Sequence, residues 1–230
     1  MTRALMGWLS LLLVLAMAGT GLAVALSLPD GVYLPVHWNG YGVADRMGSK
    51  WEALLMPASV SAFMALIFYF LPSLEPRAQN LERSRGLYMM AWLGMLIVMV
   101  TAHVGILGSA LGWGLPIIRM IQGSIGLLFV LIGNQLGKSR RMFLTGIRTP
   151  WTLASEEVWI ATHRFAGKLV VGSGLLLILA AVLPLPTWTT VPLLIGVILG
   201  STLVPMLYSF WLWRREKKAG QASGQVSSSE

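Results

Sequence analysis

The chain has 230 residues, of which 56% are hydrophobic and 11% are charged, against roughly 25% charged residues in an ordinary soluble domain. The mean hydropathy is +0.71 and the apolar residues form long uncharged blocks, which excludes a water-soluble domain and indicates one integral membrane domain. Cysteine is absent, which excludes disulfide scaffolds, thiolate metal sites and iron–sulfur clusters.

Six apolar stretches are long enough to cross a hydrocarbon core, which takes about 20 helical residues. The first span is 1–28, whose uncharged stretch exceeds the apolar region of a signal peptide. The second to fourth spans lie in 52–137, where a Gly/Pro turn at 112–116 separates the last two, and the fifth and sixth lie in 169–213. Because lipid offers no partner to open backbone groups, we predict an all-α, six-helix transmembrane bundle.

Three segments lie outside these spans. The first is an extracytoplasmic loop at 29–51, with short extended segments around Pro35 and a turn after Trp38. This loop is either a compact cap whose Gly and Asn residues serve turns, or a surface that shields the bilayer or receives an extracellular peptide. The second is an amphipathic cytoplasmic loop at 138–168, and the third is a Gly/Ser/Gln-rich tail at 214–230 that we expect to be disordered.

The orientation of the spans follows from the basic residues. Fourteen of the 17 Lys and Arg residues lie in segments that share one face, two lie in the opposite loop, and Arg119 lies inside a span. Loops rich in Lys and Arg stay in the cytoplasm, so we predict that both termini are cytoplasmic. The net charge of +8 is then explained by topology and by attraction to anionic lipid, without any nucleic acid partner.

The cytoplasmic loop at 138–168, which we call the inner loop, carries the densest set of unusual residues. Thr149 followed by Pro150 predicts the start of a short interfacial helix, on which aromatic and apolar residues would share one side. One interpretation is an amphipathic connector whose tryptophans lie among lipid headgroups. The other is a cytoplasmic recognition surface made of Arg148, Trp151, Glu157, Trp159 and His163.

Three polar side chains lie inside the predicted spans. His103 lies in the outer third of the third span, and Arg119 and Gln122 lie at a similar depth in the fourth, so all three could meet across one helix pair. A charged residue in the bilayer either faces the bundle or extends to the interface. The three residues therefore predict either plain snorkelling of Arg119 or a small polar cavity beneath the outer loop, closed by Asp45 or His37.

The inner loop and the extracytoplasmic loop at 29–51, which we call the outer loop, each resemble segments of known families. The run Gly-Ile-Arg-Thr-Pro-Trp-Thr-Leu at 146–153 and its flanking residues resemble the signature of the SdpI family of membrane immunity proteins; the motif residues are Asn134, Gly146, Arg148, Thr149, Pro150, Trp151, Thr152, Ser155, Glu157, Trp159 and His163. The outer loop resembles the DUF1648 domain that often precedes that signature, through Pro35, His37, Trp38, Asn39, Gly42 and Asp45.

The resemblance implies a polytopic protein of the bacterial cytoplasmic membrane. It also implies tolerance to a secreted membrane-active peptide toxin and binding of a cytosolic transcriptional repressor. The alternatives from the residues themselves are a small-solute or ion permease and a lipid-binding structural protein. The three histidines lack the spacing of a metalloprotease helix, and no phosphate-binding loop is present, so we predict no enzyme activity, no metal and no cofactor.

Overall fold

The computed structural model describes residues 2–39 and 41–227, so Met1, Gly40 and 228–230 lie outside the described residues. Within the described part, six helices are long and apolar enough to cross a membrane. They are α1 (Arg3–Ser27), α2 (Lys50–Leu74), α4 (Arg85–Leu111), α5 (Ile117–Leu136), α7 (Glu156–Val182) and α8 (Thr190–Ser227). The predicted all-α bundle with six spans is therefore confirmed, and the chain is a multi-pass membrane protein.

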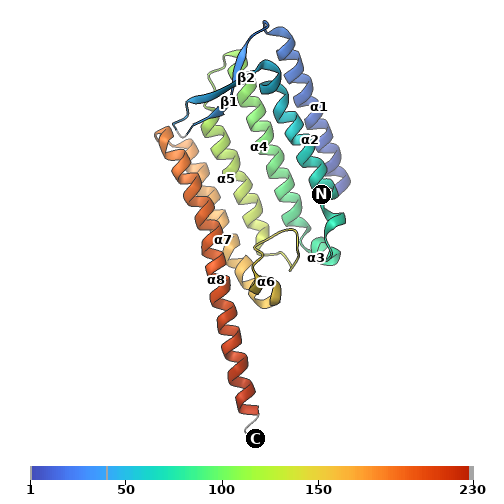
Figure 1. Ribbon diagram of the computed structural model, residues 1–230, viewed down its shortest axis with the longest axis vertical. Helices are drawn as coiled ribbons and strands as arrows, with labels where there is room; N and C mark the ends of the chain where they lie inside the picture. The colour runs from blue at the N-terminus through green and yellow to red at the C-terminus, as the bar shows by residue number, and fades with distance from the viewer. Residues whose placement is uncertain (1, 40, 228–230) are drawn as a thin grey trace.

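The remaining elements lie at the two ends of the bundle (Figure 1). The hairpin of β1 (Tyr33–Trp38) and β2 (Ala44–Ser49) covers one end, together with the 3₁₀ turn η1 (Thr187–Thr189). We call this the hairpin end. The short helices α3 (Ala78–Arg83) and α6 (Pro150–Ala154) lie at the other end, which we call the α6 end. Helix α8 projects far beyond its neighbours at the α6 end.

Two clusters of buried side chains hold α1, α2, α4, α5 and α7 together. The cluster toward the α6 end contains Trp92 and Trp159, both fully buried, together with Met142 of the inner loop. The cluster beneath the hairpin contains Leu34 of β1, Leu54 of α2 and residues of α1, α4 and α5. Each cluster therefore anchors one of the non-membrane segments to the bundle.

The hairpin is more regular than the sequence predicts. Extended segments around Pro35 are present as β1, but their partner strand β2 was not predicted because Ala44–Ser49 is polar and short of β-branched and aromatic residues. The two strands pair antiparallel, from Tyr33 opposite Ser49 to Trp38 opposite Ala44, and their register shifts between Pro35 and Trp38. Proline has no N–H to donate to a strand ladder, which is consistent with an irregularity that begins there.

Two boundaries differ from those predicted. The 138–168 loop ends earlier, because α7 begins at Glu156 and runs without a break into the fifth span. The expected interfacial helix is therefore only the five residues of α6, and Ser155 separates the two helices by accepting a hydrogen bond from the N–H of Val158, 3.2 Å away. The tail at 214–230, expected to be disordered, is helical as far as Ser227, and it contains no proline that would end the helix.

Candidate functional site

The motif of the inner loop runs from Gly146 to His163, and we call it the inner motif. Its helix α6 begins with a capped turn. The Thr149 hydroxyl oxygen accepts a hydrogen bond from the N–H of Thr152 at 3.2 Å, and the Thr152 hydroxyl oxygen accepts one from the N–H of Thr149 at 2.9 Å. With Pro150 at the first helical position, this reciprocal pair starts α6. The predicted helix start at Thr149 and Pro150 is thus present, and it positions the rest of the motif.

His163 of α7 joins the two ends of the motif by hydrogen bonds. Its Nε2 accepts a hydrogen bond from the N–H of Ile147 at 2.9 Å, and its Nδ1 donates to the carbonyl oxygen of Trp159 at 2.8 Å. Because an amide N–H can only donate, this geometry assigns the proton to Nδ1 and a neutral imidazole. The ring also stacks on Trp159 with centroids 4.0 Å apart, and both side chains are fully buried.

Gly146 allows this close approach. Its φ is +104°, and a Cβ added there would lie 2.8 Å from His163 Nε2 and 2.9 Å from the Trp159 ring. Any larger residue would therefore meet both a strained backbone and the imidazole. The motif from Gly146 to His163 is a packed structural unit that fixes the inner loop on α7.

This packing changes the predicted recognition surface. Trp159 and His163 are buried in the bundle, so they cannot contact a partner directly, because the inner loop folds over them. Arg148 and Glu157 are exposed, and Trp151 is half-buried. Of the remaining motif residues, Thr149 and Thr152 are buried, Ser155 is half-buried, and Asn134, Gly146 and Pro150 are exposed.

Ser209 of α8 is a motif contact that sequence reasoning missed. Its hydroxyl oxygen accepts a hydrogen bond from the indole N–H of Trp151 and lies 3.5 Å from the Thr149 hydroxyl. The Trp151 ring packs on Phe210 at 5.2 Å between centroids. Ser209 is separated from Trp151 by 58 residues and lies within an apolar span, so no local pattern marks it.

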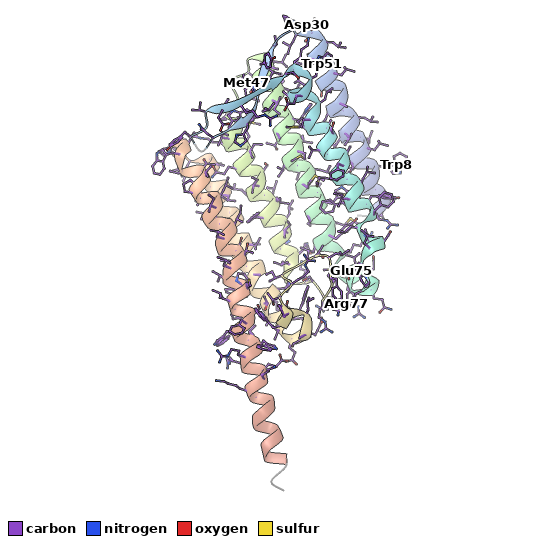
Figure 2. All side chains as sticks on the ribbon, viewed as in Figure 1. Trp8, Asp30, Met47, Trp51, Glu75 and Arg77 are labelled. Carbon is purple, nitrogen blue, oxygen red and sulfur yellow. The ribbon has the colours of Figure 1, made fainter. Side chains whose placement is uncertain are left out.

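Glu75, at the end of α2, is a second contact that sequence reasoning missed. Its buried carboxylate accepts hydrogen bonds from the N–H groups of Arg77, Phe143 and Leu144, at 2.8 to 3.1 Å. The guanidinium of Arg77 lies over the Phe143 ring, 4.6 Å from its centroid. Figure 2 shows Glu75 and Arg77 together at the α6 end of the bundle, where they fasten the inner loop to α2.

The hairpin is held by two polar side-chain pairs and by one contact to the α7–α8 connection. His37 Nδ1 lies 2.6 Å from a carboxylate oxygen of Asp45, and the buried ammonium of Lys50 lies 3.0 Å from a carboxylate oxygen of Asp30. The Thr187 hydroxyl donates to the carbonyl oxygen of Tyr41 at 2.8 Å. Figure 2 shows Asp30, Met47 and Trp51 at this end.

A cavity of about 460 Å³ lies beneath the hairpin. We call it the outer cavity. Its walls come from α2, α4, α5 and α8, and its rim from β1 and Asn39. Most lining side chains are apolar, and the polar ones are His37, Asn39, Gln122 and Thr190. A pocket of this size and lining suits an apolar ligand with a few polar contacts.

The three intramembrane polar residues do not meet. His103 hydrogen-bonds the Thr20 hydroxyl of α1 at 2.9 Å, Gln122 donates to the carbonyl oxygen of Leu177 in α7 at 3.2 Å, and Arg119 donates to the carbonyl oxygen of Leu185 at 3.0 Å. The expected convergence was wrong because each side chain is used by a different neighbouring segment. His37 does line the cavity under the hairpin, but that cavity is apolar rather than polar and does not include Asp45, His103 or Arg119.

Comparisons with known proteins agree with the two resemblances in the sequence. The model of the SdpI/YfhL protein family matches residues 138–209, and the model of the domain of unknown function DUF1648 matches residues 12–60. The curated protein named Immunity protein SdpI, from Bacillus subtilis (strain 168), is 26% identical over 150 residues, covering 65% of this chain and 69% of that protein. No solved structure matches. The predicted resemblance to the SdpI family, with a DUF1648 segment before it, is confirmed.

Proposed function

We propose that this chain is an immunity protein of the bacterial cytoplasmic membrane that gives tolerance to a secreted membrane-active peptide. The observation that carries this proposal is the outer cavity. Its lining combines His37, Trp38 and Val60 from the segment that resembles DUF1648 with Thr190 and Leu194 from the segment that resembles the SdpI/YfhL family. The name of the Bacillus subtilis relative, an immunity protein, supports the same proposal.

The chemistry of the cavity fits an apolar peptide segment. A membrane-active peptide presents an apolar face to the bilayer, and the outer cavity offers apolar walls beneath the hairpin. The rim residues His37 and Asn39 can hydrogen-bond polar groups at the end of a peptide helix. Binding there protects the cell if the peptide prefers the cavity to its membrane-damaging state, because only a difference in affinity shifts a population.

Substitutions that fill the cavity test this function. Val60 lines the cavity, so we expect Val60→Trp to abolish tolerance when the full chain is expressed in a sensitive bacterium that is challenged with a panel of membrane-active peptides. Val204→Trp is the matched control, because Val204 is similarly exposed, at 44% against 37%, but lies on α8 outside the cavity lining.

The killing curves decide the proposal. We expect the wild type and Val204→Trp to raise the survival of the host, and Val60→Trp to fall to the level of an empty vector at equal amounts in the membrane. Survival with the wild-type chain that equals the empty vector for every peptide would refute the immunity function. Full tolerance with Val60→Trp would instead remove the outer cavity from the mechanism.

The α6 end supports a second part of the proposal, the binding of a cytosolic repressor. Arg148 and Glu157 are exposed there, and α8 extends past the bundle (Figure 1). We expect Arg148→Ala to weaken capture of such a repressor by membranes that contain the chain, while Arg164→Ala, an exposed control on α7, leaves capture unchanged. Equal capture by both variants would exclude Arg148 from the binding surface.

A further inference from the structure

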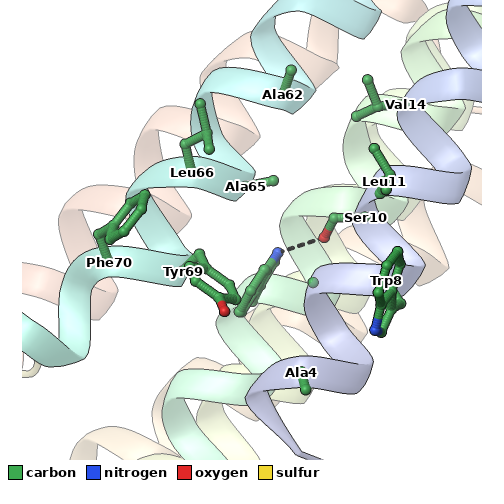
Figure 3. A pocket seen from close by; sticks show the side chains of 12 residues that line it. Ala4, Trp8, Ser10, Leu11, Val14, Ala62, Ala65, Leu66, Tyr69 and Phe70 are labelled. Atoms are coloured by element: carbon green, nitrogen blue, oxygen red, sulfur yellow. Dashed lines mark hydrogen bonds between the residues drawn. The ribbon is translucent and has the colours of Figure 1, made fainter.

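A second cavity, of about 490 Å³, lies between α1 and α2 on the side of the bundle away from α8. We call it the α1–α2 cavity. Figure 3 shows Trp8, Leu11 and Val14 on one wall and Leu66 and Phe70 on the other. These residues touch neither the outer cavity nor the inner motif, so the proposed immunity function does not use them.

The floor of this cavity contains two polar side chains, and both already donate hydrogen bonds within the protein. The indole N–H of Trp92 donates to the Ser10 hydroxyl oxygen at 3.0 Å, and that hydroxyl donates to the carbonyl oxygen of Met6 at 2.8 Å. Figure 3 shows the Ser10 contact as a dashed line across the floor. Because these two groups are paired with one another, the floor has no unpaired hydrogen-bond donor. Apart from the floor, the Tyr69 hydroxyl and the Trp8 indole, only apolar side chains line the cavity. Its shape and walls favour a hydrocarbon chain.

The length of the cavity matches one leaflet. The lining residues on α1 run from Ala4 to Val14, which is about 15 Å along a helix that rises 1.5 Å per residue. Half of a hydrocarbon core of about 30 Å has the same length. An acyl chain within one leaflet is therefore long enough to span the cavity from end to end.

A cationic cavity of about 420 Å³ adjoins the apolar one at the α6 end. Its lining includes Arg3, Arg85 and one acid, Glu82, which lies 3.2 Å from Arg85. The guanidinium of Arg3 lies 5.4 Å from the ring centroid of Tyr69. Since Tyr69 lines the α1–α2 cavity, this contact joins the two, and the net charge of the lining is positive.

We propose that the two cavities together bind one anionic phospholipid. Its phosphate lies beside Arg3 and Arg85, and one acyl chain lies between α1 and α2 against Trp92. Basic pockets between transmembrane helices are known to bind anionic headgroups, and the apolar cavity supplies what a free phosphate ion lacks. A membrane-active peptide arriving from the hairpin end is disfavoured, because the site is lined by the first half of α1 and the second half of α2, away from that end.

Native mass spectrometry of the full chain tests this site. The protein is released from nanodiscs that contain equal amounts of phosphatidylglycerol and phosphatidylcholine, and the bound lipids are counted. We expect one phosphatidylglycerol to be retained by the wild type. Arg3→Gln removes the phosphate contact and Ala62→Phe fills the apolar cavity, and each should lower the retained fraction about fivefold or more.

Two control variants separate this site from ordinary lipid contact. Arg83→Gln removes an exposed charge at the same end, and Ala16→Phe adds a ring to an exposed position of α1, both outside the two cavities. We expect both to retain phosphatidylglycerol as the wild type does. Equal retention of the two phospholipids by the wild type, or equal losses in the test and control variants, would overturn the proposal whatever the outcome of the tolerance assay.

Discussion

Glu75 joins parts of the chain that are 68 residues apart, because its carboxylate accepts hydrogen bonds from the N–H groups of Phe143 and Leu144 in the inner loop. An amide in its place has only one oxygen to accept with, and its NH₂ group would face backbone donors. We therefore expect Glu75→Gln to destabilise the protein by about 2 kcal/mol, the usual worth of hydrogen bonds to a charged group.

The effect of Glu75→Gln has two readouts. Thermal unfolding in micelles should occur at a lower temperature, and trypsin should cut the inner loop at Lys138, Arg140 and Arg141 faster than in the wild type. Glu82→Gln is the control, since Glu82 is exposed and forms an ion pair with Arg85; a surface ion pair of this kind adds little stability, so neither readout should change. Unchanged cleavage of the Glu75→Gln variant would show that its carboxylate does not hold the loop.

The sequence identified the residues of the inner motif, but it did not predict which of them are buried. Thr149 and Pro150 carry a local signal for a helix start, and the structure contains that helix. His163 and Trp159 gave no such signal, because a polar imidazole in a loop of mixed polarity is as compatible with a surface as with a core. Its burial depends on Gly146 and the N–H of Ile147, contacts that only the folded loop creates.

At the level of elements, α5 and α7 approach each other through two glycine pairs. A Cβ added to Gly174 would lie 2.5 Å from the carbonyl oxygen of Gly126, and one added to Gly133 would lie 2.8 Å from the backbone nitrogen of Val171 and 2.9 Å from the carbonyl oxygen of Gly167. Both members of each pair recur seven residues apart along their helices. Small residues of this kind let membrane helices pack closely without a hydrophobic driving force.

We expect Gly174→Ala to push α5 and α7 apart, because the obstructing atom is backbone and cannot turn away. Overpacking of this kind costs about 1–3 kcal/mol, which should appear as unfolding at a lower denaturant concentration. Gly172→Ala is the control on the same helix, where an added Cβ meets nothing within 4 Å. It should be neutral or stabilising, since alanine favours helix more than glycine does. Equal stability of the two variants would contradict close packing at Gly174.

The predicted elements were most accurate where the pattern was long. Uncharged apolar runs indicated all six spans, because hydrocarbon thickness alone sets their length. The hairpin partner β2 was not predicted, since Ala44–Ser49 has weak strand propensity. Trp159 was expected on the short interfacial helix, but neither the break at Ser155 nor the continuation of α7 into the fifth span was predicted. Strand β2 depends on contacts between segments, such as the pairing of Tyr33 with Ser49.

The whole molecule has two chemically different ends. The hairpin end carries Arg46 and Lys50, while 14 of the 17 basic residues lie in segments at or near the α6 end. Loops that carry an excess of Lys and Arg remain in the cytoplasm. The proposed roles of the outer cavity and of the α6 end both depend on this orientation, since a secreted peptide arrives from outside and a repressor from inside.

Single-cysteine labelling tests the orientation directly, because the natural chain has no cysteine that would react in the background. Met47 of β2 is 51% exposed, and Ala154 of α6 is exposed at the other end. A membrane-impermeant maleimide should label the Met47→Cys variant nearly completely in spheroplasts. It should label the Ala154→Cys variant only after the membrane is permeabilised. Labelling of both variants in sealed spheroplasts, or of Ala154→Cys alone, would reverse or remove the predicted sidedness, and with it the assignment of the outer cavity to a peptide that approaches from outside.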